Sequence, residues 1–201
     1  FMAYKRMCAG RGFQLDWSFD QYCQIAHYSA EGLKIAIYEK FPDLKKTEPS
    51  WNVLYAEKKQ AIIDLLNEGA VHIMPGVERL LLALKEAGIA RCVVTHSPDE
   101  LVNVVRKKNP VLDTIPVWFT REHYSEPKPN PECYLMAIEK MSKPGNQVIG
   151  FEDTPRGLKA LMGTCAKPVL ICRAHYPEIP AFINAGAVHF PSFDSIPDNA
   201  L

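Results

Sequence analysis

From residue 71 onward, short apolar runs alternate with stretches of helical pattern, and this alternation constrains the fold more than any other feature of the sequence. The runs are rich in valine and isoleucine and include ARCVVTH, IPVWFT, QVIGF, PVLIC and AVHF. Such unbroken apolar strands are typical of parallel sheets that helices cover on both faces. We therefore predict an α/β domain over 71–201, a Rossmann-like parallel sheet with helices on both faces. Functional sites in such sheets lie at the carboxyl ends of the strands.

Residues 1–70 carry helical patterns and no strand-like run. Ser18, followed by Gln21 three residues later, forms a capping-box pattern, and Ser50 precedes an apolar stripe that ends at Gly69. Helices joined by short loops are typical of a small bundle. The sequence therefore predicts a helical domain over 1–70, ahead of the α/β domain.

Composition excludes several classes of partner. The chain has 23 Lys plus Arg and 23 Asp plus Glu, so its formal net charge is zero, whereas proteins that bind nucleic-acid backbones are usually basic. No apolar run reaches the roughly 18 residues that a membrane helix needs. The six cysteines form no C-x-x-C pair, which favours a reducing, cytoplasmic compartment. We expect a monomer with neither a nucleic-acid nor a membrane partner.

Thr95, His96 and Ser97 follow the first apolar run of the α/β domain, at the start of a helical pattern. A hydroxyl group, free backbone N–H groups and a helix dipole together make a site for an anion. Ser97 is the predicted N-cap of this helix, which leaves Thr95 able to hold a phosphate.

Lys128 lies between Pro127 and Pro129 in the string EPKPNPECY, after the second run. The two prolines restrict the backbone and would hold the lysine in a fixed place. The alternative is an ordinary solvated loop lysine.

Glu152 and Asp153 end the run QVIGF. Adjacent carboxylates repel each other unless a cation or a proton offsets their charge. Mg²⁺ is usually held by a few carboxylates together with waters and a phosphate, so a magnesium site fits this pair. The alternative is an acidic helix start, with Thr154 as the N-cap and Pro155 as the first helical residue. With a hydroxyl and a lysine at the same sheet edge, the pair could bind a phosphoryl group and its magnesium.

The strings VVTHSP, EPKPNPECY and GFEDTPRGLKA, in this order and spacing, resemble the second, third and fourth motifs of the haloacid dehalogenase superfamily. The chain is most similar to the branch with a helical cap, which includes beta-phosphoglucomutase and phosphoglycolate-type phosphatases. This resemblance implies that Thr95 hydrogen-bonds the transferring phosphoryl group and that Lys128 neutralises its charge. It also implies that Glu152 and Asp153 hold Mg²⁺.

The segment IAHYSAEGLKIAIY is similar to the family's substrate-specificity loop and the helix that follows it. By this resemblance His27, Tyr28 and Ser29 would bind the substrate from the cap. His96 and Ser97 would contact it from the core.

The family's nucleophile is an aspartate in a D-x-D-G motif, and no such string occurs in this sequence. Phe1 resembles a point in the first cap helix shortly after that motif. We therefore expect the chain to lack about twenty N-terminal residues, which suffice for one strand, its loop and a helix start. That strand would be central, between strands 91–95 and 147–151, so these two strands are predicted not to pair directly.

The resemblance implies a Mg²⁺-dependent phosphatase of small phosphorylated metabolites that works through an aspartyl-phosphate. Because the nucleophile would lie in the missing segment, the 201 residues by themselves are expected to be inactive. One alternative is a sugar-phosphate mutase similar to beta-phosphoglucomutase, which would need a basic residue from the cap; no arginine directly follows Ser29. The other is a catalytically inactive protein that binds phosphate or a partner.

Overall fold

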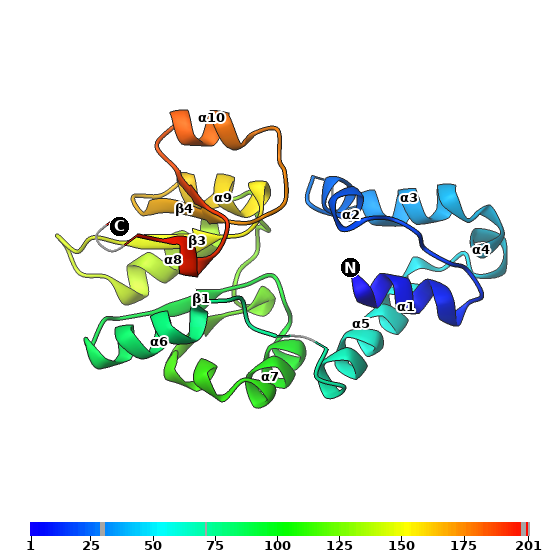
Figure 1. The fold of residues 1–201 in the computed structure, drawn as a ribbon, viewed down its shortest axis with the longest axis horizontal. Coiled ribbons are helices and arrows are strands. Elements are labelled where there is room, and N and C mark those ends of the chain that lie inside the picture. The colour runs from blue at the N-terminus through cyan, green and yellow to red at the C-terminus, as the bar shows by residue number, and fades with distance from the viewer. Residues whose placement is uncertain (29–30, 71, 198–199, 201) are drawn as a thin grey trace. The chain divides into compact units, whose positions relative to one another are not determined.

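The computed structural model describes residues 1–28, 31–70, 72–197 and 200. The chain divides into two compact units, Phe1–Val71 and His72–Leu201, which are coloured blue to cyan and cyan to red in Figure 1. None of the described helices is both long enough and apolar enough to cross a membrane.

The described part of the first unit is helical. Its helices are α1 (Met2–Gly10), α2 (Phe19–Ala26), α3 (Gly32–Lys40), α4 (Pro42–Thr47) and α5 (Trp51–Asn67). The predicted capping box is confirmed, because Gln21 N donates to Ser18 Oγ at 3.1 Å and Ser18 N donates to Gln21 Oε1 at 2.8 Å. Buried side chains of α1, α3 and α5, among them Met7, Ile37 and Leu54, form the core of this unit.

The second unit alternates helices with parallel strands, which confirms the predicted α/β fold. Its strands are β1 (Cys92–Val94), β2 (Val117–Phe119), β3 (Ile149–Glu152), β4 (Lys167–Ile171) and β5 (Val188–Phe190). Its α-helices are α6 (Val77–Glu86), α7 (Asp99–Lys108), α8 (Glu132–Met141), α9 (Pro155–Met162) and α10 (Ile179–Asn184). Short 3₁₀ segments are η1 (Pro110–Thr114), η2 (Arg121–His123) and η3 (Phe193–Ser195).

The strands of the second unit belong to two sheets. β1 pairs with β2, with Cys92 opposite Val117, and β4 lies between β3 and β5 in the other sheet. Among the described residues β1 and β3 do not pair, which confirms the prediction for these two strands. Each therefore has one edge without a strand partner in this part of the chain, and Ile149 of β3 is 39% exposed.

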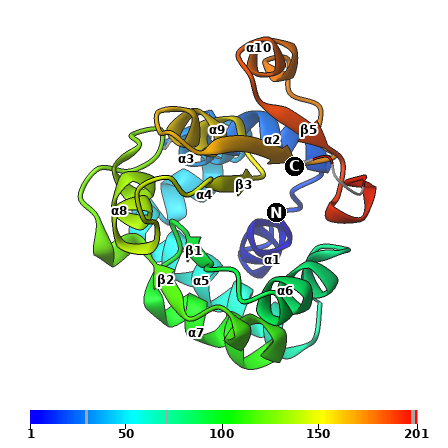
Figure 2. The same ribbon diagram turned by 90° about the vertical axis from the view of Figure 1, so that its left-hand side faces the viewer.

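Helix α8 contacts both groups of strands. It packs on β1 and on α9, and Figure 2 shows β1 and β2 near α7 and β3 near α9. The core around α8 contains Cys133, Tyr134 and Leu161, with Val94 of β1 packed against it. The carboxyl ends of β1 and β3 are thus joined through one helix and the loop that precedes it.

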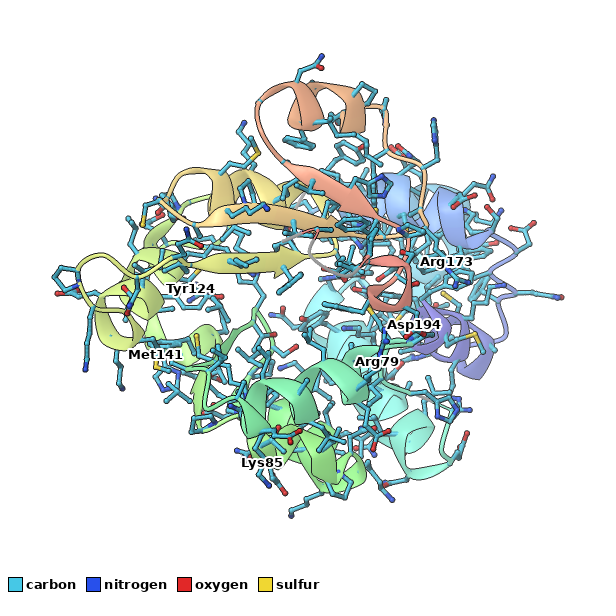
Figure 3. The ribbon with its side chains drawn as sticks, turned by 60° about the vertical axis from the view of Figure 1, so that its left-hand side comes forward. Arg79, Lys85, Tyr124, Met141, Arg173 and Asp194 are labelled. Carbon is cyan, nitrogen blue, oxygen red and sulfur yellow. The ribbon has the colours of Figure 1, made fainter. Side chains whose placement is uncertain are left out.

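A pocket of about 340 Å³ is lined in part by Phe151 of β3. Its lining is mainly apolar: Gly76, Arg79, Leu80, Ala83, Phe151, Phe193, Ile196 and Pro197. The guanidinium of Arg79 on α6 lies 3.5 Å from the carboxylate of Asp194 in η3, and Figure 3 shows the two side by side. This ion pair ties the C-terminal segment to α6 at the rim of the pocket.

Candidate active site

Lys128 is buried between the two sheets rather than solvated, so the alternative of an ordinary loop lysine is wrong. The side chains of Lys128 and Glu152 are 9% and 7% exposed, and Lys128 Nζ lies 2.5 Å from Glu152 Oε1. The same ammonium group donates to the hydroxyl of Tyr134 at 2.8 Å and to the carbonyl oxygen of Val94 at 3.3 Å. One cation therefore joins the last residue of β3 to the last residue of β1.

The loop that carries Lys128 is held by hydrogen bonds at both ends. Lys128 N donates to His96 Nε2 at 2.9 Å, which ties the loop to the residues after β1. The carboxylate of Glu132, at the start of α8, accepts from the backbone N–H groups of Ser125 and Glu126 at 2.9 and 2.6 Å. The direction of the Lys128 side chain is thus fixed by its own backbone.

His96 serves this arrangement as a neutral acceptor. Burial first, and then the positive charges of Lys128, Arg156 and Arg121, lower the pKa of His96 from its ordinary 6.5 to about 4. Its Nε2 is therefore unprotonated at neutral pH and can accept the hydrogen bond from Lys128 N. The ring stacks on Tyr124 with 5.8 Å between centroids.

Thr95 follows β1 and keeps its hydroxyl hydrogen available. Its Oγ1 accepts from Ser97 N at 3.1 Å, and its backbone carbonyl accepts from the hydroxyl of Tyr124 at 3.1 Å. The prediction that Ser97 caps the next helix is wrong: the N-cap of α7 is Pro98, with no side-chain cap bond. Ser97 instead lies in the preceding turn, where its carbonyl accepts from Arg121 N at 3.2 Å.

Glu152 and Asp153 differ in their surroundings. Glu152 is 8% exposed, and its Oε1 accepts from both Lys128 and the hydroxyl of Tyr134. Asp153 is exposed at the surface, but protein atoms surround its carboxylate closely. The resulting desolvation, and secondly the negative charge of Glu152, raise the pKa of Asp153 to about 6. Of the pair, Asp153 is the carboxylate that a bound cation can reach.

The helix start that the sequence offered as the alternative explanation of this pair is present in the structure. Thr154 is the N-cap of α9, with its Oγ1 accepting from Gly157 N at 3.1 Å, and Pro155 is the first helical residue. A Cβ atom at position 157 would collide with the carboxylate of Glu152. Only glycine therefore allows the buried carboxylate to lie against the first turn of α9.

The donor set fits Mg²⁺. This ion typically binds one or two carboxylates and completes its octahedral shell with waters and phosphate oxygens. Asp153 supplies an accessible carboxylate beside a second one, and no cluster of three or more His, Cys, Asp or Glu side chains able to hold a metal occurs among the described residues. These two carboxylates suit a metal ion that also binds phosphate oxygens better than one held by protein ligands alone.

Sequence reasoning missed Tyr134. Its hydroxyl bonds to both Lys128 and Glu152, the Lys128 ammonium lies 4.6 Å from the centre of its ring, and it is 8% exposed. Burial and the charge of Glu152 raise the pKa of Tyr134, so the hydroxyl stays protonated and donates to the carboxylate. The sequence signal that could have identified Tyr134 is its position six residues after Lys128, on the buried face of α8.

The residues expected to bind substrate from residues 1–70 lie in the first unit. His27 is the C-cap of α2, and its ring meets that of Tyr22 edge-on at 6.1 Å. Tyr28 is 42% exposed, and Ser29 lies outside the described residues. Their role in substrate binding stays a prediction.

A family model described as haloacid dehalogenase-like hydrolase matches residues 24–162. The chain belongs to this family. The protein CbbY of Cereibacter sphaeroides is 23% identical over 167 residues, which are 80% of this chain and 71% of that protein. A phosphorylated carbohydrates phosphatase of Thermotoga maritima is 24% identical over 135 residues, 67% of this chain and 60% of that protein.

The fold is also that of solved members of the family. The crystal structure of CbbY from Rhodobacter sphaeroides in complex with phosphate superposes with a TM-score of 0.73. The match has 21% sequence identity and covers 96% of this chain and 87% of that one. The Rossmann-like architecture predicted from the alternating runs is therefore confirmed.

Proposed function

We propose that this haloacid dehalogenase-like hydrolase is a Mg²⁺-dependent phosphatase of small phosphorylated metabolites. The observation that carries the proposal is the contact network of Lys128, which reaches Glu152 at the end of β3 and Val94 at the end of β1. A cation, the hydroxyl of Thr95 and the carboxylate of Asp153 thus gather at the strand ends, where α/β sheets bind their ligands.

Each of these groups has a role in the proposal. Lys128 and the hydroxyl of Thr95 bind oxygens of the transferring phosphoryl group and stabilise its charge. Asp153, assisted by Glu152, would hold Mg²⁺, which when bound neutralises further charge on the phosphoryl oxygens. His96 holds the backbone of Lys128 and so fixes where its ammonium lies.

We further propose that the nucleophile is an aspartate on a strand between β1 and β3, supplied from outside these 201 residues. Three observations support it: the unpaired edges of β1 and β3 in the described chain, the exposure of Ile149, and the apolar pocket beside Phe151. Neighbouring strands lie about 4.8 Å apart, so one inserted strand pairs with both edges where these lie roughly 9–10 Å from each other. The aspartate would form an aspartyl-phosphate that water then hydrolyses.

The relatives support a phosphorylated substrate. CbbY was crystallised with phosphate, and the Thermotoga maritima relative is a phosphatase of phosphorylated carbohydrates. The buried cation Lys128 and the exposed carboxylate of Asp153 are suited to the same class of ligand.

The test is hydrolysis of a panel of sugar phosphates and phospho-acids by the full-length protein, with and without Mg²⁺. Asp153→Asn should abolish release of inorganic phosphate, whereas Glu139→Gln, on the exposed face of α8, should leave it unchanged. Phosphorus NMR separates hydrolysis from isomerisation, which would indicate a mutase. If the full-length protein binds phosphate and catalyses neither reaction, the proposal is wrong and an inactive phosphate-binding protein remains.

A further inference from the structure

Arg156 is a charged residue that the proposed chemistry does not use. It is the second residue of α9, three positions after Asp153, and it is half-buried. Within the part of the chain that the structure describes, its guanidinium makes no hydrogen bond and no ion pair. A guanidinium carries five donors and a permanent charge, and none of its nitrogens in Arg156 is among the solvent-excluded, unpartnered atoms of the described chain, so an anionic group can reach them.

Arg156 lies in the first turn of α9, which begins three residues after the carboxyl end of β3. Its charge acts on His96, and it also acts on Tyr124, whose hydroxyl donates to the carbonyl of Thr95. The rings of His96 and Tyr124 are stacked, and the charge of Arg156 lowers the pKa of both side chains.

The other charges around His96 already have partners. Lys128 is paired with Glu152 at 2.5 Å. Arg121 donates to the carbonyl oxygens of Tyr124 and Ser125 at 2.6 and 3.3 Å. Of the three cations that act on the pKa of His96, Arg156 is the one with no acceptor among the described residues.

We propose that Arg156 binds a second anionic group of the substrate, a carboxylate or a phosphate, while the transferring phosphoryl group lies at Lys128 and Thr95. This inference rests on the proposed function and adds the substrate class, which is phosphorylated hydroxy acids or bisphosphates rather than neutral sugar monophosphates. A guanidinium suits this role because its planar fork can bind a carboxylate or a phosphate with two parallel hydrogen bonds.

Three hydrolysis-resistant probes of similar length test the inference by calorimetry with the full-length protein and Mg²⁺. Ethylphosphonate has one anionic group, 3-phosphonopropionate adds a carboxylate, and propane-1,3-diphosphonate adds a second phosphonate. The wild type should bind at least one of the two probes that have two anionic groups roughly tenfold or more tightly than it binds ethylphosphonate. Whichever of the two binds more tightly identifies the second group.

Arg156→Gln should remove this preference and leave the affinity for ethylphosphonate unchanged, and Arg156→Lys should retain only part of it. Lys159→Gln, an exposed change of the same charge on the same helix, should bind all probes as the wild type does. Equal affinities of the wild type for all three probes, or an Arg156→Gln variant that keeps the preference or loses all three probes equally, would overturn the role of Arg156. A wild type that binds no phosphonate would contradict the proposed function as well.

Discussion

Replacing Lys128 with methionine should destabilise the chain by about 3–5 kcal/mol, because it leaves the Glu152 carboxylate buried without a counter-charge. The two side chains are only 9% and 7% exposed, so water can compensate little of the loss. Among the side chains that the structure describes, Tyr134 alone would still donate to Glu152 Oε1. Single domains commonly unfold with about 5–15 kcal/mol, so the loss would be a large part of the total.

A double-mutant cycle separates the ion pair from the packing of the methylene groups. Glu152→Gln alone leaves the ammonium of Lys128 without a carboxylate and should also be costly. The double variant contains no uncompensated buried charge, so its cost should fall short of the sum of the single costs by more than about 1 kcal/mol.

The assay is urea unfolding at pH 7.5, followed by circular dichroism and tryptophan fluorescence. Lys159→Gln is the matched control, because Lys159 is exposed and its replacement should change the free energy of unfolding by less than about 0.5 kcal/mol. A cost below about 1 kcal/mol for Lys128→Met, or strictly additive costs in the cycle, would refute the buried ion pair.

Three further predictions follow from the same site. His96 has a pKa of about 4 when folded and 6.5 ordinarily, so the unfolded chain binds one proton more between these pH values. Stability should therefore fall by up to about 3 kcal/mol as the pH drops from 6.5 to 4, and His96→Gln should remove that part of the slope in denaturation measured across this range. Tyr134→Phe, which deletes a hydroxyl bonded to Lys128 and Glu152, should cost about 1–2 kcal/mol in urea unfolding; an unchanged midpoint would contradict the bonds. Gly157→Ala should destabilise the chain although alanine favours helices by about 1 kcal/mol, and a stabilised variant would show that Glu152 does not lie against α9.

The pH dependence of stability is compared between the wild type and His96→Gln because protonation of Asp153 changes the stability in the opposite direction. Its pKa is raised to about 6, so the folded chain binds a proton there more readily than the unfolded chain does. This contribution stabilises the fold as the pH falls below 6. Since it is present in both proteins, the comparison with His96→Gln isolates the imidazole.

Local signals were enough to predict most of the elements. Apolar runs bounded by capping residues located all five strands, and Ser18 and Thr154 cap α2 and α9 as their neighbours in sequence suggest. Ser97 failed as a cap because a second hydroxyl, that of Thr95, accepts the N–H of Ser97 and holds it in the preceding turn. A choice between two nearby turns depends on packing that a sequence pattern does not contain.

The sequence indicated candidate residues for the site, but not how their side chains contact one another. The string around Lys128 indicated a rigid loop, and the pair Glu152 and Asp153 indicated a cation. Lys128 is itself a cation in contact with Glu152, 24 positions away in the sequence, and this contact depends on how α8 packs on β1 and α9. Tyr134 was missed for the same reason, because its hydroxyl acquires a role only once α8 is in place.

The bridge made by Lys128 has a consequence for how the second unit opens. Its ammonium bonds to the last residue of β3 and to the last residue of β1, and these strands belong to different sheets. The parts of a protein that unfold together often coincide with supersecondary motifs, and here the two sheets with their helices are such motifs. With the bridge intact, amide hydrogens of β2 and β4 should exchange through a shared opening, with similar protection. Weakening the contacts of Lys128 should let the two sheets open separately, so a substitution at these strand ends would be detected first as faster amide hydrogen exchange inside one sheet.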